Sequence, residues 1–177
     1  EFDLVLCFDG AISFSGHKAG NVISEICRVG KKVMLSVSSK SCMTATWLNY
    51  CLTKLNRIHP SVNDMMKTGY FSKDDYDDAE ELTSISELKA YDVDELRDVL
   101  HKNGMNVLEC HSIGSLTHLY LLHLYRQNTA EGVYEKINAI STDKDFIEIC
   151  DYYDKFVMPN GMGSFRRAGI FAVAEKS

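Results

Sequence analysis

The chain has few prolines, no excess of positive charge and no long apolar runs. It holds only two prolines among 177 residues, while 45% of the residues are hydrophobic and 25% are charged. These proportions are typical of one compact domain and exclude disordered and fibrous classes. No apolar run reaches the ~18 residues of a membrane-spanning helix, and no basic segment followed by an apolar run opens the sequence. We therefore expect a cytoplasmic protein with no membrane partner.

Positive charge is outnumbered, with 19 Lys and Arg against 25 Asp and Glu and a formal net charge of -6. Binding along a phosphate backbone depends on clustered Lys and Arg, so we expect no nucleic-acid partner. A small-molecule substrate fits this composition better. The sequence leaves homodimer formation open.

Several chemical motifs are also missing. The six cysteines contain no C-x-x-C pair, and most lie in apolar segments, which predicts buried free thiols. Cys110 and the histidines after it match neither a zinc ribbon nor an H-E-x-x-H helix, and the acidic stretch 74–81 lacks the ligand spacing and central glycine of an EF-hand. We predict no metal. A hydrolase is disfavoured because no G-x-S-x-G elbow or P-loop occurs.

Short apolar runs alternate with helical patterns along the chain. Asp92 and Glu95 form a capping-box pattern at the start of one helix. Irregular segments at about 40–90 and 116–160 separate these units, and we predict that both are helical inserts. The other predicted elements are strands at Phe2–Phe8, Lys32–Ser38, Met105–Cys110 and Ala168–Ala174, and a helix at His17–Val29.

This order predicts an α/β fold whose early strands are parallel and joined by right-handed crossovers. Ligands of such sheets bind beyond the carboxyl ends of the strands. Here those ends are 7–13, 38–41 and 111–115, and all three are rich in small or polar residues. We expect them to line one crevice.

Three segments of the sequence stand out by their order and wording. They are Phe-Asp-Leu-Val-Leu at 2–6, the run Glu25–Val37 through Gly30-Lys-Lys-Val-Met-Leu-Ser-Val, and Asp94-Glu-Leu with Asn103-Gly-Met-Asn-Val107. Together they resemble the second half of class I S-adenosylmethionine-dependent methyltransferases. The resemblance implies a Rossmann-like sheet, mostly parallel, with a last antiparallel strand near Ala168–Ala174. It also implies S-adenosylmethionine as cofactor, with contacts from Cys7, Phe8, Asp9 and Gly10.

The family's first strand, its glycine-rich turn and its acidic ribose-binding residue all stand upstream of the segment that resembles 2–6. None of them stands in this sequence, so we expect a fragment of a longer protein whose sheet is incomplete at its amino-terminal side. Alone, such a fragment is expected to be inactive and to expose an edge of its sheet.

Methyl transfer needs alignment of the acceptor atom and, for a weak nucleophile, removal of a proton. Candidate catalytic groups at the strand ends are Asp9, His17 and His111. The inserts are expected to cap the substrate, and ordinary helix packing is the alternative for each of their aromatic residues. The candidate substrate contacts are Trp47, Tyr50, Tyr120 and Arg166.

The predicted function is methyl transfer from S-adenosylmethionine to a small molecule, carried out by the longer parent protein. The alternative is a noncatalytic binding or regulatory protein that retains a methyltransferase-like fold. Neither the acceptor nor its reacting atom can be named from the sequence.

Overall fold

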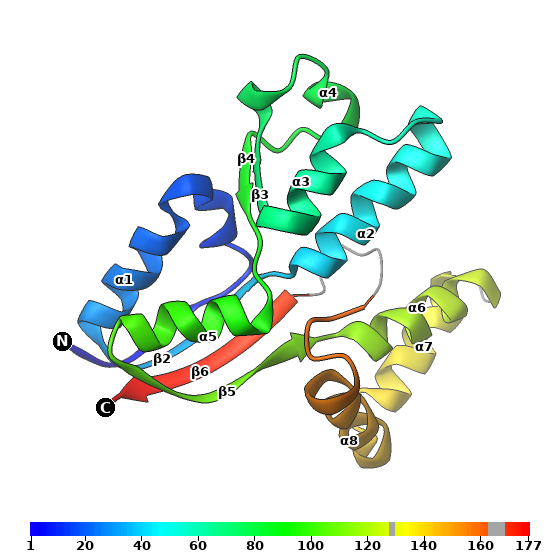
Figure 1. Cartoon of the computed structure of the whole chain (residues 1–177). Coiled ribbons are helices and arrows are strands. Elements are labelled where there is room, and N and C mark those ends of the chain that lie inside the picture. The colour runs from blue at the N-terminus through cyan, green and yellow to red at the C-terminus, as the bar shows by residue number, and fades with distance from the viewer. Residues whose placement is uncertain (128–129, 163–168) are drawn as a thin grey trace.

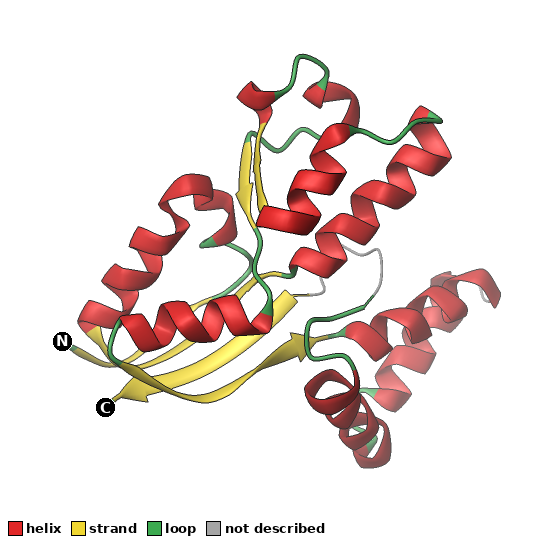
Figure 2. Ribbon diagram, in the orientation of Figure 1, coloured by secondary structure: helices red, strands yellow, loops and turns green. Residues whose placement is uncertain are grey.

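A four-stranded sheet forms the centre of the protein, whose computed structural model describes residues 1–127, 130–162 and 169–177. The spatial order is β1-β2-β6-β5, and β6 is antiparallel to both of its neighbours (Figures 1 and 2). Because β2 and β5 both oppose β6, they run in the same sense as β1, which pairs parallel with β2. The strands are β1 (Phe2–Cys7), β2 (Gly30–Ser38), β5 (Met105–Ile113) and β6 (Gly169–Lys176).

The prediction of an α/β fold is confirmed, but the sheet is mixed and not mostly parallel. Only the β1–β2 pair is parallel, because the last strand lies between β2 and β5 instead of at an edge. The predicted strand Met105–Cys110 is also longer than expected. Its pairing with β6 continues to Ile113, so His111 lies within the strand and not beyond its end.

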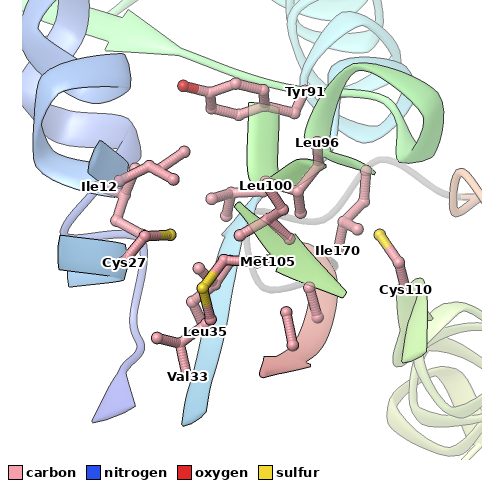
Figure 3. Packing of buried hydrophobic residues seen from close by; sticks show 14 of the residues in the cluster. Ile12, Cys27, Val33, Leu35, Tyr91, Leu96, Leu100, Met105, Cys110 and Ile170 are labelled. Atoms are coloured by element: carbon pink, nitrogen blue, oxygen red, sulfur yellow. The ribbon is translucent and has the colours of Figure 1, made fainter. Parts of the chain in front are cut away.

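Two helices, α1 (Ala19–Val29) and α5 (Val93–Lys102), cover one face of the sheet (Figure 1). Their apolar stripes follow the helical period, so Ile23 and Cys27 on α1 and Leu96 and Leu100 on α5 point to the same side. These side chains pack on β2 and β6 in one continuous core (Figure 3). The fully buried strand residues of this core are Val33, Leu35, Ile170, Ala172 and Ala174.

The capping box predicted for α5 is present. The Asp92 carboxylate accepts a hydrogen bond from the Glu95 backbone N–H at 2.8 Å, and the Glu95 carboxylate accepts one from the Asp92 N–H at 3.2 Å. The helix expected from His17 begins differently. A 3-10 helix, η1 (Ser13–Lys18), precedes α1, and Gly16 within it leaves the helical region with φ 53°.

The segment between β2 and α5 forms an insert with its own small core. Trp47 packs edge-on against Phe71, with their ring centroids 4.8 Å apart, and Met65 and Leu88 are fully buried beside them. The prediction of a helical insert is correct only in part, because the insert also contains a two-stranded antiparallel sheet of three-residue strands. Its elements are α2 (Lys40–Tyr50), η2 (Cys51–Leu55), α3 (Pro60–Thr68), β3 (Tyr70–Ser72), η3 (Lys73–Asp75), α4 (Ala79–Leu82) and β4 (Glu87–Lys89).

The chain leaves and re-enters the main body of the protein at a single point. Tyr91 N–H donates to the Ser38 carbonyl at 2.9 Å, and Lys40 N–H donates to the Tyr91 carbonyl at 2.8 Å. The Lys40 ammonium also lies 3.1 Å from Asp92 and 2.8 Å from Glu95. The first residue of α2 is thereby tied to the capping box of α5.

A second helical segment follows β5, as predicted. It consists of α6 (Ser115–Gln127), α7 (Ala130–Ile140), α8 (Lys144–Tyr152) and the π-helical turn η4 (Tyr153–Val157). These helices lie beyond the carboxyl end of β5, away from α1 and α5 (Figure 1). No helix in the described part of the chain is long and apolar enough to cross a membrane.

The other face of the sheet is apolar and largely uncovered by the described residues. Side chains alternate along a strand, so Leu4 and Leu6 point away from Val5 and the core. They are 47% and 55% exposed. Leu6 is in register with Met34 and Met34 with Val173, so the apolar row continues across the sheet. At its outer edge, β1 pairs with no other described strand.

Substitution of Lys40 tests the junction of the insert. Lys40→Met leaves two carboxylates without their shared cation, and the Lys40 side chain is only 12% exposed. We expect the free energy of unfolding to fall by about 1–2 kcal/mol in urea denaturation, because Lys40 and its two carboxylate partners are partly buried. Lys67→Met, at an exposed position of α3, is the control and should change it little. Equal losses in both variants would contradict the role of the junction.

Candidate functional site

The carboxyl ends of β1, β2 and β5 lie along one edge of the sheet. Ser38 and Ile113 are both in register with Gly169, so β2 and β5 end at the same level. The connection after β1 is fixed to the end of β2, because the Ser38 N–H donates to Ser13 Oγ at 2.8 Å. This edge carries the segments that the sequence predicts for a ligand site.

The end of β1 is the open part of this edge. Asp9 has a positive φ of 58° and Gly10 one of 73°, so the chain turns sharply, and the Gly10 carbonyl accepts a hydrogen bond from the Phe14 N–H at 3.0 Å. Asp9 is exposed, and its carboxylate forms no hydrogen bond or ion pair with the described residues. Phe8 is also exposed and stacks on Phe171, with ring centroids 6.4 Å apart. Burial raises the pKa of the Cys7 thiol, so Cys7 remains neutral here.

Beyond β2, the polar groups satisfy one another through Asn160. Its carbonyl accepts hydrogen bonds from the hydroxyls of Ser39 and Ser41, at 2.5 and 2.8 Å. Its side-chain Oδ1 accepts a hydrogen bond from the Val93 N–H at 2.7 Å. Asn160 therefore joins the first turns of α2 and α5.

Asp154 has the same structural role beyond β5. Its carboxylate is buried and accepts hydrogen bonds from the backbone N–H groups of Gly114 at 2.6 Å and Ser115 at 3.1 Å. The Ser112 hydroxyl lies 3.4 Å from the same carboxylate. A carboxylate at these N–H groups caps α6 and interacts favourably with its dipole. Local sequence patterns gave no sign of this residue, because its partners are about 40 positions away.

The structure places the candidate base His111 under cover. Its Nδ1 lies 2.7 Å from the Ser112 carbonyl, which can only accept, so Nδ1 carries the proton. Its ring packs edge-on against Phe171 at 6.1 Å. Nε2 is buried and has no hydrogen-bond partner among the described residues. A substrate can reach this nitrogen only if the residues that cover it move.

The candidate base His17 lies on η1 and is 65% exposed. Its Nδ1 lies 2.7 Å from Glu87 Oε1, on β4 of the insert. The Tyr70 hydroxyl donates a hydrogen bond to the same carboxylate oxygen. These hydrogen bonds, first that of Tyr70 and then that of His17, lower the pKa of Glu87 to about 2. Sequence reasoning missed Glu87 and Tyr70 because only the fold of the insert brings them to η1.

Of the four predicted substrate contacts, the three that lie in the described residues do not gather at the edge. Trp47 is buried in the core of the insert, so it packs there and does not face a substrate. Tyr50 is the last residue of α2 and lies about 15 Å along the helix axis from the end of β2. Tyr120 packs on Phe146, with ring centroids 5.3 Å apart. Arg166 lies outside the described residues.

All six cysteines are free thiols, as predicted, and all except Cys7 are buried. Burial raises the pKa of Cys110 to about 11. Within the described ranges, no group of three His, Cys, Asp or Glu residues could hold a metal ion. The turn at Asp9 and Gly10 is the part of the edge that could meet a cation, because the Asp9 carboxylate is exposed and has no partner among the described residues.

Comparison of the chain with protein-family models, with curated proteins and with solved structures finds no match. The function must therefore be inferred from the geometry of the chain itself.

Asp154→Asn tests the cap of α6. Asparagine replaces one accepting carboxylate oxygen of the buried side chain with an NH2 group. This donor would face the backbone N–H groups of Gly114 and Ser115, which also donate. We expect a loss of about 2–3 kcal/mol in unfolding free energy, measured by urea denaturation. Asp151→Asn is the matched control on the neighbouring turn, where the carboxylate is exposed and a change of under about 0.5 kcal/mol is expected. If Asp154→Asn lost no more unfolding free energy than Asp151→Asn, the cap of α6 would be unimportant for stability.

Glu87 should titrate abnormally. In the folded chain its carboxyl is expected to protonate near pH 2, and the contact with η1 to weaken as the pH falls through that value. The direction follows from linkage, since a lowered pKa means that the ionised form is favoured by folding. Carboxyl resonances followed by NMR measure the midpoint. Tyr70→Phe should raise it towards 4.5, and an unchanged midpoint in that variant would contradict the assignment.

Proposed function

We propose that the chain is part of a longer protein that transfers a methyl group from S-adenosylmethionine to a small molecule. The observation that carries the proposal is the direction of the strands. Three strands of the same sense end at one edge, and the last strand of the chain runs against them. This agrees with the antiparallel last strand of class I methyltransferases, which the sequence segments resemble.

The proposed cofactor contacts are the residues at the end of β1. S-adenosylmethionine supplies a methyl group bonded to a positively charged sulfur, and its methionine part carries an ammonium group. The exposed carboxylate of Asp9 would pair with such a cation, and the backbone of Cys7, Phe8 and Gly10 would line the methionine part.

The uncovered face of the sheet supports a longer parent protein. Sheets with parallel strands and helical crossovers are covered on both faces, whereas here Leu4, Leu6 and Phe8 remain exposed. The outer edge of β1 also pairs with no other strand among the described residues. Additional chain that covers this face and pairs with β1 would remove both liabilities and complete the cofactor site.

The two inserted segments are proposed to cover the acceptor. The first leaves the sheet at Ser39, the second at Gly114, and both points lie on the edge that carries the site. In Figure 1 the two segments stand on either side of the carboxyl ends of β2 and β5. We propose that residues of both segments would contact a small molecule bound there.

One observation favours the alternative of a noncatalytic binding or regulatory protein. The polar groups beyond β2 and β5 are satisfied within the chain, through Asn160 and Asp154. Of the three strand ends, only that of β1 has a charged side chain, Asp9, without a partner among the described residues. A charged group at the end of β1 would be enough for a protein that binds the cofactor or its product without transferring the methyl group.

Calorimetric titration of the longer parent protein with S-adenosylhomocysteine tests the proposal. We expect binding, and we expect Asp9→Asn to weaken it about tenfold because one charge-assisted contact is lost. Asp3→Asn, at the other end of β1 where the carboxylate pairs with Lys31, is the control and should bind normally. Absence of binding in the unaltered parent protein would exclude the methyltransferase.

A further inference from the structure

We propose that His17, held by Glu87 and Tyr70, is the proton acceptor of this site and that the methyl acceptor is a hydroxyl group. The inference rests on the proposed function, since it names the residue that would activate the acceptor. It adds two positioning residues, Glu87 and Tyr70, that come from the insert and not from the strand ends.

The hydrogen bonds fix which nitrogen of His17 is free. A carboxylate only accepts, so the imidazole donates from Nδ1 to Glu87 Oε1 at 2.7 Å. In the neutral ring the lone pair then lies on Nε2. This nitrogen forms no hydrogen bond with the described residues, and the side chain is 65% exposed. In its neutral form, His17 therefore presents the lone pair of Nε2 to incoming molecules, with a carboxylate bound at Nδ1.

The surroundings of Glu87 are shaped to hold it in place. Its side chain is 25% exposed, and it receives the Tyr70 hydroxyl as well as the imidazole. On the η1 side, Gly16 has no side chain, and a Cβ there would lie 2.1 Å from the Glu87 Cδ. Any other residue at position 16 would displace the carboxylate. The close approach of β4 to η1 thus depends on this glycine.

His59, in the insert that carries Glu87, is a histidine with a purely structural role. The ring of His59 is fully buried, and both of its nitrogens are engaged, Nδ1 by Ser61 at 2.7 Å and Nε2 by Asp78 at 2.9 Å. His17 also has a carboxylate partner, but its second nitrogen faces outward. The pairing therefore orients the ring without using up its capacity to take a proton.

The position of His17 suits this role. One short connection after β1 carries the exposed turn at Asp9 and Gly10 and then η1 with His17. The Ser13 hydroxyl accepts a hydrogen bond from the end of β2, which fixes the start of η1 at the edge formed by the carboxyl ends of β1, β2 and β5. The proposed cofactor contacts and the proton acceptor are thus held by the same segment.

The proposed step explains why the acceptor is a hydroxyl. A neutral amine attacks without first losing a proton, whereas a hydroxyl oxygen is a weak nucleophile until its proton leaves. The hydroxyl gives its proton to His17 Nε2 while its oxygen bonds to the methyl carbon. The carbon–sulfur bond breaks, and its electron pair remains on the sulfur. The imidazolium formed is stabilised by Glu87 and returns the proton to solvent.

Reaction of the chain with diethyl pyrocarbonate at pH 8 tests the free Nε2 without any need for methyl transfer. Mass spectrometry would give the rate at each histidine. His17 is expected to react about fivefold faster than His101 and His123, which are exposed and have no carboxylate partner among the described residues. Glu87→Gln should bring His17 to their rate. Equal rates in the unaltered chain would overturn the proposal.

Tyr70→Phe is the second variant, in case Glu87→Gln fails to fold as judged by circular dichroism. It leaves both charged partners in place, and it should lower the His17 rate because Glu87 is held less firmly. A rate unchanged in Tyr70→Phe would also count against the proposal.

Phenol and anisole form a matched pair of probes for the acceptor class, since only phenol can donate a hydrogen bond. Phenol should shift the ¹⁵N resonance of His17 Nε2, and anisole should not. Equal effects of the two probes would overturn the hydroxyl acceptor. Because this measurement needs no cofactor, its failure is distinguishable from a failure of the parent protein to bind S-adenosylhomocysteine.

Discussion

The pairing of β6 with both β2 and β5 is the constraint on which the rest of the structure depends. Within the described residues, β5 has no other partner in the sheet, and β2 would otherwise be joined only to β1. Because β6 opposes both neighbours, they share a direction and end at the same level. Alternate residues of β6 are fully buried under α1 and α5, so the same strand also completes the core.

Much of this framework could be predicted from the sequence, because its signals are local. The apolar runs of β1 and β2 and the capping box at Asp92 each depend on residues within a few positions of one another. The strands β3 and β4 have three residues each, too few to display an alternating pattern. The place of β6 in the sheet could not be derived from periodicity, which carries no information about partners.

The candidate site was predictable only in part, for the same reason. The end of β1 follows from a strand and a turn signal, and Asp9 and His17 were found that way. Their environments depend on distant residues. Glu87 reaches His17 across 70 positions, whereas Ser112, the neighbour of His111, turns that imidazole inward. Two histidines that look equivalent in the sequence therefore differ in access to solvent.

The way in which the first insert joins the sheet has a consequence for how this protein can diversify. Its entry and exit are bridged by two backbone hydrogen bonds between Ser38, Lys40 and Tyr91. Its interior is a separate apolar cluster around Trp47 and Phe71. A module attached in this way can be lengthened, shortened or replaced without altering the register of the strands. Evolution can thus exchange the residues of this insert while the scaffold beneath them is inherited intact.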